Sequence, residues 1–94
     1  MTTVNGSMKS DRPERYAKQL VSHWSDRGPV TTEDGATVQR WTTGQVLVLR
    51  PADDVLEVEL SVPDGDDSAR FAQLVKDHLE RFGQGDELDL VWHL

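Results

Sequence analysis

Residues 11 to 29 read DRPERYAKQLVSHWSDRGP and carry the clearest structural pattern in this sequence of 94 residues. Apolar side chains recur within one arc at about 100° per residue, which predicts an amphipathic helix with one face toward a core. Asp11 and Glu14 are spaced as a capping box, and Pro13 suits a first helical turn. Gly28, in a left-handed conformation, and Pro29 predict the end of the helix. The apolar arc consists of Pro13, Tyr16, Ala17, Leu20, Val21 and Trp24.

One edge of this helix carries a row of polar and half-polar side chains: Arg12, Tyr16, Gln19 and His23. Such a row can border a cleft, or it can mark the boundary between the core and water. We favour the boundary, because an amphipathic helix always has such a margin.

The segments around the first helix predict strands. Val4–Lys9 forms a short first strand, in which Gly6 indicates a sheet edge or a close approach of another group. Asp34-Gly35 is a preferred dipeptide of two-residue turns and predicts a hairpin over residues 30–41. The continuous apolar run within residues 45–50 predicts a central strand of the sheet.

The second half of the chain continues with a turn at residues 51–54 and an alternating, half-buried strand at residues 55–62. A second helix is expected over residues 67–82, with an acidic cap before it and Gly83 as its stop. Residues 87–94 alternate again as a last strand. The order β-α-β-β-β-β-α-β predicts an α+β fold of two layers, an antiparallel sheet of about five or six strands with two helices on one face.

We predict that the helices and the sheet share one apolar core. Its members are Leu20, Trp24, Leu47, Leu56, Val58, Leu60, Phe71, Leu74, Leu79 and Trp92.

Length and composition favour one small domain spanning residues 1–94, in which residues 1–3 are expected to be disordered. There is no cysteine, which excludes disulfides and thiolate sites. The formal charge is −7 and the basic residues are scattered, which argues against nucleic acid or an anionic membrane as a partner. No apolar run has the length of a signal peptide or a membrane span, so we expect a cytoplasmic protein.

The sequence contains no glycine-rich phosphate loop, no G-x-S-x-G and no H-E-x-x-H. Its three histidines, His23, His78 and His93, match no local metal motif, so we predict no catalytic residue, no metal and no cofactor. His78 lies within the apolar arc of the second helix, and His23 lies at the margin of the first, so the two rings could meet. They would form either a hydrogen-bonded structural pair, which we favour, or a candidate ligand-binding site together with Tyr16 and Gln19.

Three strings resemble a bacterial family of unknown function, DUF2218: RYAKQLVSHW, HLERF and LDLVW. The resemblance extends from about Lys9 to Trp92, in the same order and at similar spacing. The family's first motif is filled here by Arg15, Tyr16, Lys18, Gln19, Leu20, His23 and Trp24, and its second by His78, Leu79, Glu80, Arg81 and Phe82.

Many members of that family have a further histidine and lysine shortly after the first motif. This chain has Asp26 and Arg27 there, which weakens the case for a histidine-rich metal site. Some members occur beside or fused to siderophore-interacting, flavin-binding reductase-like proteins. The resemblance therefore implies a partner of that type and a role in bacterial iron or siderophore utilisation.

Taken together, these patterns predict a non-catalytic binding module. The alternative is a metal- or small-ligand-binding domain, or a minor enzyme, with its site at His23 and His78. We expect a monomer, because Glu57, Glu59 and Asp89 place charge on the outer side of the sheet.

Overall fold

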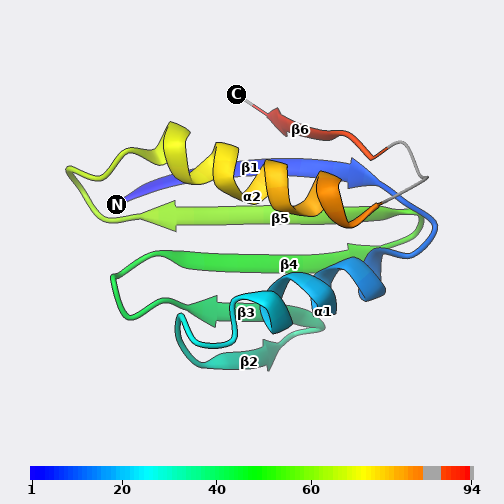
Figure 1. Ribbon diagram of the computed structural model, residues 1–94, viewed down its shortest axis with the longest axis horizontal. Coiled ribbons are helices and arrows are strands. Elements are labelled where there is room, and N and C mark those ends of the chain that lie inside the picture. The colour runs from blue at the N-terminus through cyan, green and yellow to red at the C-terminus, as the bar shows by residue number, and fades with distance from the viewer. Residues whose placement is uncertain (84–87, 94) are drawn as a thin grey trace.

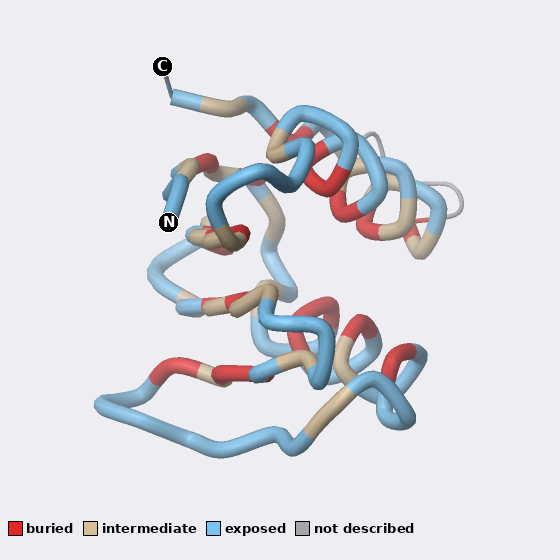
Figure 2. Tube along the Cα trace, turned by 90° about the vertical axis from the view of Figure 1, so that its left-hand side faces the viewer, coloured by how far each residue is buried: buried red, intermediate tan, exposed pale blue. Residues whose placement is uncertain are grey.

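The computed structural model of the protein describes residues 1–83 and 88–93. Six strands form one sheet, and two helices pack against one of its faces, as Figures 1 and 2 show from two directions. The predicted α+β fold and its element order are confirmed. In chain order the elements are β1 (Thr2–Lys9), α1 (Pro13–His23), β2 (Val30–Glu33), β3 (Ala36–Arg40), β4 (Val46–Ala52), β5 (Val55–Val62), α2 (Ser68–Phe82) and β6 (Leu90–His93).

The strand order β2-β3-β4-β5-β1-β6 is antiparallel throughout. β1, the first strand of the chain, therefore lies between β5 and the last strand, β6. Helices α1 and α2 lie over different parts of the sheet. Helix α1 covers β3, β4 and β5, whereas α2 covers β1, β5 and β6. Within the described residues, neither helix is long and apolar enough to cross a membrane.

The two hairpins follow the turn chemistry of the sequence. Asp34 and Gly35 both have positive φ, at 50° and 79°, and connect β2 to β3 as predicted. The turn after β4 is shorter than the predicted span of residues 51–54, because Pro51 pairs with Leu56 inside the ladder. The pairing of β4 with β3 ends at Leu49. Proline is tolerated at position 51 because β3 no longer pairs with β4 there and needs no N–H from it.

The first strand differs from expectation in two ways. Thr2 and Thr3 pair with β5, although residues 1–3 were expected to be disordered. β1 is also an interior strand, so the edge explanation for Gly6 is wrong and the close approach is correct. A Cβ at Gly6 would lie 2.6 Å from the Trp92 ring.

Helix α1 begins and ends differently from the prediction. Arg12 is the N-cap and its side chain makes no cap hydrogen bond, so Asp11 does not cap this helix. Ser10 Oγ instead accepts a hydrogen bond from the Arg12 N–H at 3.0 Å. The helix ends at His23, and Gly28 lies in the loop without a left-handed φ. A Cβ at Gly28 would clash with the Arg40 carbonyl oxygen, so close backbone packing explains the glycine.

Helix α2 agrees with its sequence signals. Asp67 is the N-cap and accepts a hydrogen bond from the Arg70 N–H, and Gly83 is the C-cap. The last strand is described from Leu90, and the predicted strand ends at residues 87 and 94 lie outside the described residues.

The core lies between the sheet and the two helices. Eight of the ten predicted members are buried in it. Leu74 is 38% exposed, and Trp92 is partly buried against the core. The buried cluster also includes Met8, Val62, Val75 and Leu90.

Candidate functional site

A row of aromatic rings lines the seam between α1 and α2. His23 and His78 lie with their ring centroids 5.1 Å apart and their planes tilted by 48°. The Trp24 ring lies 4.9 Å from His78, and Phe82 meets His23 edge-on at 5.8 Å. We call these residues the ring row, together with Trp41 and Phe71, which continue it. The two imidazoles of the sequence motifs therefore meet, as we predicted from the helix faces.

The ring row continues from Trp24 toward the loop after β3. Trp24 contacts Trp41 at 5.1 Å and 78°, and Trp41 contacts Phe71 at 5.1 Å and 89°. The Arg27 guanidinium lies 5.6 Å from the Trp41 ring centre. Edge-to-face packing and a cation over an indole are both favourable geometries. The row thus joins both helices to the loop after β3 by ring contacts.

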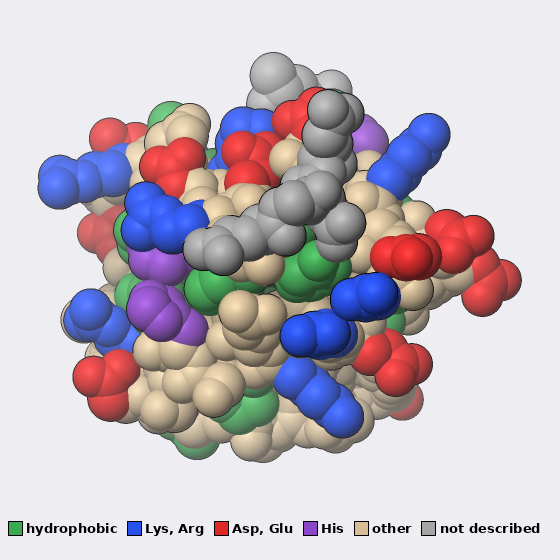
Figure 3. Space-filling model, turned by 45° about the vertical axis from the view of Figure 1, so that its right-hand side comes forward, with side chains coloured by type: hydrophobic (Ala, Val, Ile, Leu, Met, Phe, Trp, Pro, Cys, Tyr) green, Lys and Arg blue, Asp and Glu red, His purple; other side chains and the backbone are tan. Residues whose placement is uncertain are grey.

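His78 is held in one orientation by its own helix. Its Nδ1 lies 2.8 Å from the Leu74 carbonyl oxygen, which can only accept a hydrogen bond. Nδ1 therefore carries the proton, and in the neutral ring Nε2 has a free lone pair. His78 is half-buried and His23 is exposed. Figure 3 shows two histidine side chains side by side at the surface.

Gln39 on β3 fixes the position of the ring row by hydrogen bonds. It is fully buried, and its Nε2 donates to the carbonyl oxygens of Trp24 and Gly28 at 2.7 and 3.2 Å. Its Oε1 accepts from the Trp41 indole N–H at 3.1 Å. One amide thus ties β3 to the end of α1 and to the indole of Trp41.

The other two predicted site residues lie elsewhere on α1. Tyr16 is only 4% exposed and belongs to the core cluster, whereas Gln19 is exposed. Neither of them lines the cavity beside Trp41. His93 lies on the outer face of the sheet, where its Nε2 is 2.9 Å from Ser7 Oγ.

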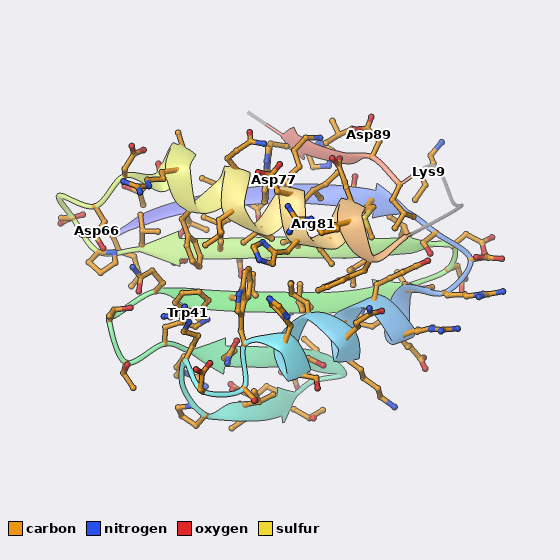
Figure 4. All side chains as sticks on the ribbon, viewed as in Figure 1. Lys9, Trp41, Asp66, Asp77, Arg81 and Asp89 are labelled. Carbon is orange, nitrogen blue, oxygen red and sulfur yellow. The ribbon has the colours of Figure 1, made fainter. Side chains whose placement is uncertain are left out.

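A cavity of about 610 Å³ opens at the end of the ring row, and we call it the Trp41 cavity. It lies between the loop after β3 and the first half of α2, and Figure 4 labels Trp41, Asp66 and Asp77 around it. Aromatic and aliphatic side chains form its walls, and carboxylates and amides form its rim. The lining residues are Trp41, Gln45, Val62, Asp66, Asp67, Arg70, Phe71, Gln73, Leu74 and Asp77.

This cavity was not predicted from the sequence, because its walls come from separate elements. Trp41 follows β3 and Phe71 lies on α2, and only the strand order places them together. The helical spacing of Leu74 from Phe71 predicted a core position, whereas the structure leaves Leu74 38% exposed beside the cavity.

These side chains favour binding. The Trp41 cavity offers aromatic faces and carboxylates, and the histidine pair offers an imidazole lone pair near the surface. Within residues 1–83 and 88–93, no group of three His, Asp or Glu side chains is placed to hold a metal ion.

Comparison with known proteins places the chain in a family. The family model described as "Uncharacterized protein conserved in bacteria (DUF2218)" matches residues 5–93. A solved structure, the NMR structure of PA4090 from Pseudomonas aeruginosa, matches with a TM-score of 0.75 at 22% identity, covering 99% of this chain and 96% of that one. At this identity the likeness establishes a shared fold. No curated protein matches the chain. Since the family model spans nearly the whole sequence, the chain belongs to DUF2218, a family of uncharacterised proteins conserved in bacteria.

Proposed function

We propose that this protein is a non-catalytic binding domain and that its ligand occupies the Trp41 cavity. The observation that carries the proposal is a hollow of about 610 Å³ whose walls include the rings of Trp41 and Phe71. Sites for small molecules are concave, mostly apolar and typically about 300–1,000 Å³ in volume, with a few polar groups that orient the ligand. The sequence supplies no catalytic motif, which supports binding over catalysis.

The ligand class follows from the charges at the rim. Asp66, Asp67 and Asp77 line the cavity together with one cation, Arg70. The whole chain carries a formal charge of −7, which attracts cations over a longer range. Aromatic faces also favour cations, most strongly that of tryptophan. We therefore assign the site to a small organic cation with a flat, apolar body.

We further propose a cellular setting, which rests on the family resemblance. The domain would act in the bacterial cytoplasm, in iron or siderophore utilisation, beside a siderophore-interacting protein of the flavin reductase type. Co-purification of the two proteins from a bacterium that encodes both would support this setting. Absence of any interaction between the purified proteins would contradict it.

Two ligands with the same ring system and opposite charge test the ligand class. Tryptamine is a cation and indole-3-acetate is an anion at neutral pH. In ¹H–¹⁵N NMR titrations, tryptamine should shift the amide signals of Gln45 and Leu74, and indole-3-acetate should bind at least about tenfold more weakly. Equal binding of both would contradict the assignment to cations.

Variants locate the site. Asp77→Asn removes a rim carboxylate and should weaken tryptamine binding severalfold. Asp34→Asn makes the same chemical change at the β2–β3 turn, away from the cavity lining, and serves as the matched control. If both variants bind tryptamine like the unmodified protein, the carboxylate does not contribute and the proposed site is wrong.

A second candidate function is ligand or metal binding at His23 and His78. The specific observation that favours it is the pairing of the two rings at 5.1 Å, with Nδ1 of His78 bonded to a carbonyl oxygen.

A further inference from the structure

We propose that His23 and His78 together bind one late divalent transition-metal ion, of the class of Zn²⁺, Ni²⁺ or Cu²⁺, through one imidazole nitrogen each. This inference rests on the second candidate function and specifies its ligand, and it is independent of the Trp41 cavity, because neither histidine lines that cavity. It rests on four features of the pair: the separation of the rings, the orientation of His78, the accessibility of the rings and the chemistry of imidazole.

The separation of the rings suits two ligands of one ion. Imidazole nitrogens bind such metals at about 2.0–2.1 Å. For two neighbouring ligands at tetrahedral or square-planar angles, the ring centres then lie roughly 4.5–5.3 Å apart. The observed centroid distance of 5.1 Å falls within this range.

The orientation of His78 is the one that metal-binding histidines adopt. Such a residue almost always donates its second N–H to a carboxylate, a carbonyl or water, which fixes the ring and makes the other nitrogen a better donor to the metal. The Nδ1–H of His78 donates to the Leu74 carbonyl oxygen at 2.8 Å, which leaves Nε2 as the metal ligand.

The surroundings hold the two rings in place without closing the site. Trp24 packs beside His78 at 4.9 Å, and Phe82 packs edge-on against His23 at 5.8 Å. His23 is exposed and His78 is half-buried, so an ion can reach the pair from solvent. Within the described residues the His23 ring forms no hydrogen bond, so both of its nitrogens are available to a metal ion.

Imidazole ligands select zinc, copper and nickel over magnesium and calcium. Since the described part of the chain provides no third His, Asp or Glu to the group, water or a donor from another molecule completes the coordination. We therefore expect reversible binding of a single ion with open coordination positions, as in metal sites that accept an exogenous ligand.

The test is calorimetric titration of the full chain with Zn²⁺ and, separately, with Ni²⁺. The unmodified protein should bind one ion. His23→Gln and His78→Gln should each weaken binding at least about tenfold, while His93→Gln, which removes the histidine of the outer face, should leave it unchanged. Circular dichroism melting checks that each variant is folded.

NMR of the imidazole nitrogens provides a second measurement that needs no variant. On addition of Zn²⁺, Nε2 of His78 and one nitrogen of His23 should shift, and the His93 nitrogens should not. If His78→Gln fails to fold, the exposed His23→Gln variant and these shifts decide the matter. Absence of binding, equal weakening by His93→Gln, or a His23→Gln variant that binds like the unmodified protein would each overturn the proposal.

Discussion

Gln39 is fully buried, and both ends of its amide are hydrogen bonded. Its Nε2 donates to two carbonyl oxygens of the α1–β2 connection, and its Oε1 accepts a hydrogen bond from the Trp41 indole N–H. A buried amide is tolerated because all the groups that it meets are paired. The residue therefore sets the position of Trp41, at the point where the ring row meets the cavity.

The prediction is that Gln39→Leu lowers the free energy of unfolding by about 1–3 kcal/mol, because it leaves buried polar groups unpaired. Denaturant unfolding measures the change. Gln19→Leu, at an exposed position of α1, is the matched control and should change stability by less than about 0.5 kcal/mol. A Gln39→Leu variant as stable as the control would show that the amide contributes no net stability.

Glu33 is the residue with the clearest electrostatic signature. Hydrogen bonds from Arg40, at 2.7 and 3.2 Å, and from Thr31 lower the pKa of the Glu33 carboxyl from 4.5 to about 2. The folded pKa lies below the unfolded one, so the pair contributes stability above about pH 4.5. That contribution is lost as the pH falls toward 2.

NMR titration of the Glu33 carboxyl should therefore give a midpoint near 2. Arg40→Gln should move the midpoint toward 4.5, because the guanidinium is the largest cause of the shift. Both side chains are about half exposed, so high salt should also raise the midpoint. A midpoint near 4.5 in the unmodified protein would mean that the ion pair is not populated in solution.

At the scale of elements, the stability of the fold depends on the apolar faces that the helices and the sheet bury against each other. Leu20 on α1 and Leu60 on β5 are both fully buried in the core. Truncation of either to alanine removes apolar contacts and leaves a cavity, so each change should cost roughly 2–5 kcal/mol of stability. Leu74→Ala on α2 is the matched control and should cost less than about 1 kcal/mol, since Leu74 is 38% exposed. Denaturant unfolding of the three variants checks the assignment, and small losses at Leu20 and Leu60 would contradict it.

The elements also show where sequence patterns suffice. Asp67 and Gly83 bound α2 as predicted, because their cap interactions are local. Asp11 and Gly28 were predicted to bound α1, but the helix begins at Pro13 and ends at His23. Gly28 is required instead by a tertiary contact, because it lies against the backbone of β3. Leu74 was assigned to the core because it shares a helical arc with Phe71, but the arc is wider than the face that the sheet covers.

The candidate site likewise has one part that the sequence predicts and another that depends on tertiary contacts. The meeting of His23 and His78 was predictable, because each ring lies at a known angle on a helix and both helices cover one face. The Trp41 cavity was not, because Trp41 meets Phe71 of α2 only through a tertiary contact between segments far apart in the chain. The same holds for Gln39, whose partners lie 15 and 11 residues away in the chain.

At the scale of the whole molecule, the sheet is covered on one face and open on the other. Polar side chains dominate the open face around a shallow hollow of about 200 Å³, which is lined by residues such as Asn5, Ser7, Glu57 and Glu59. Both edge strands of the described sheet, β2 and β6, have only four residues. Short edges and charged faces both oppose association through the sheet.

We therefore expect a monomer, which sedimentation velocity at low micromolar concentration would detect as a single species of about 10.6 kDa. The residue that most opposes this expectation is Val91 on β6, which is 51% exposed. If a tight dimer forms, Val91→Lys decides how it forms. Dissociation by that change would show that two copies pair through β6 and the open face, so that the sheet's polar side chains are satisfied across the interface. A dimer that survives the change must use the helical side instead, where it would cover the histidine pair or the Trp41 cavity, and both proposed sites would then have to be tested at concentrations where the monomer prevails.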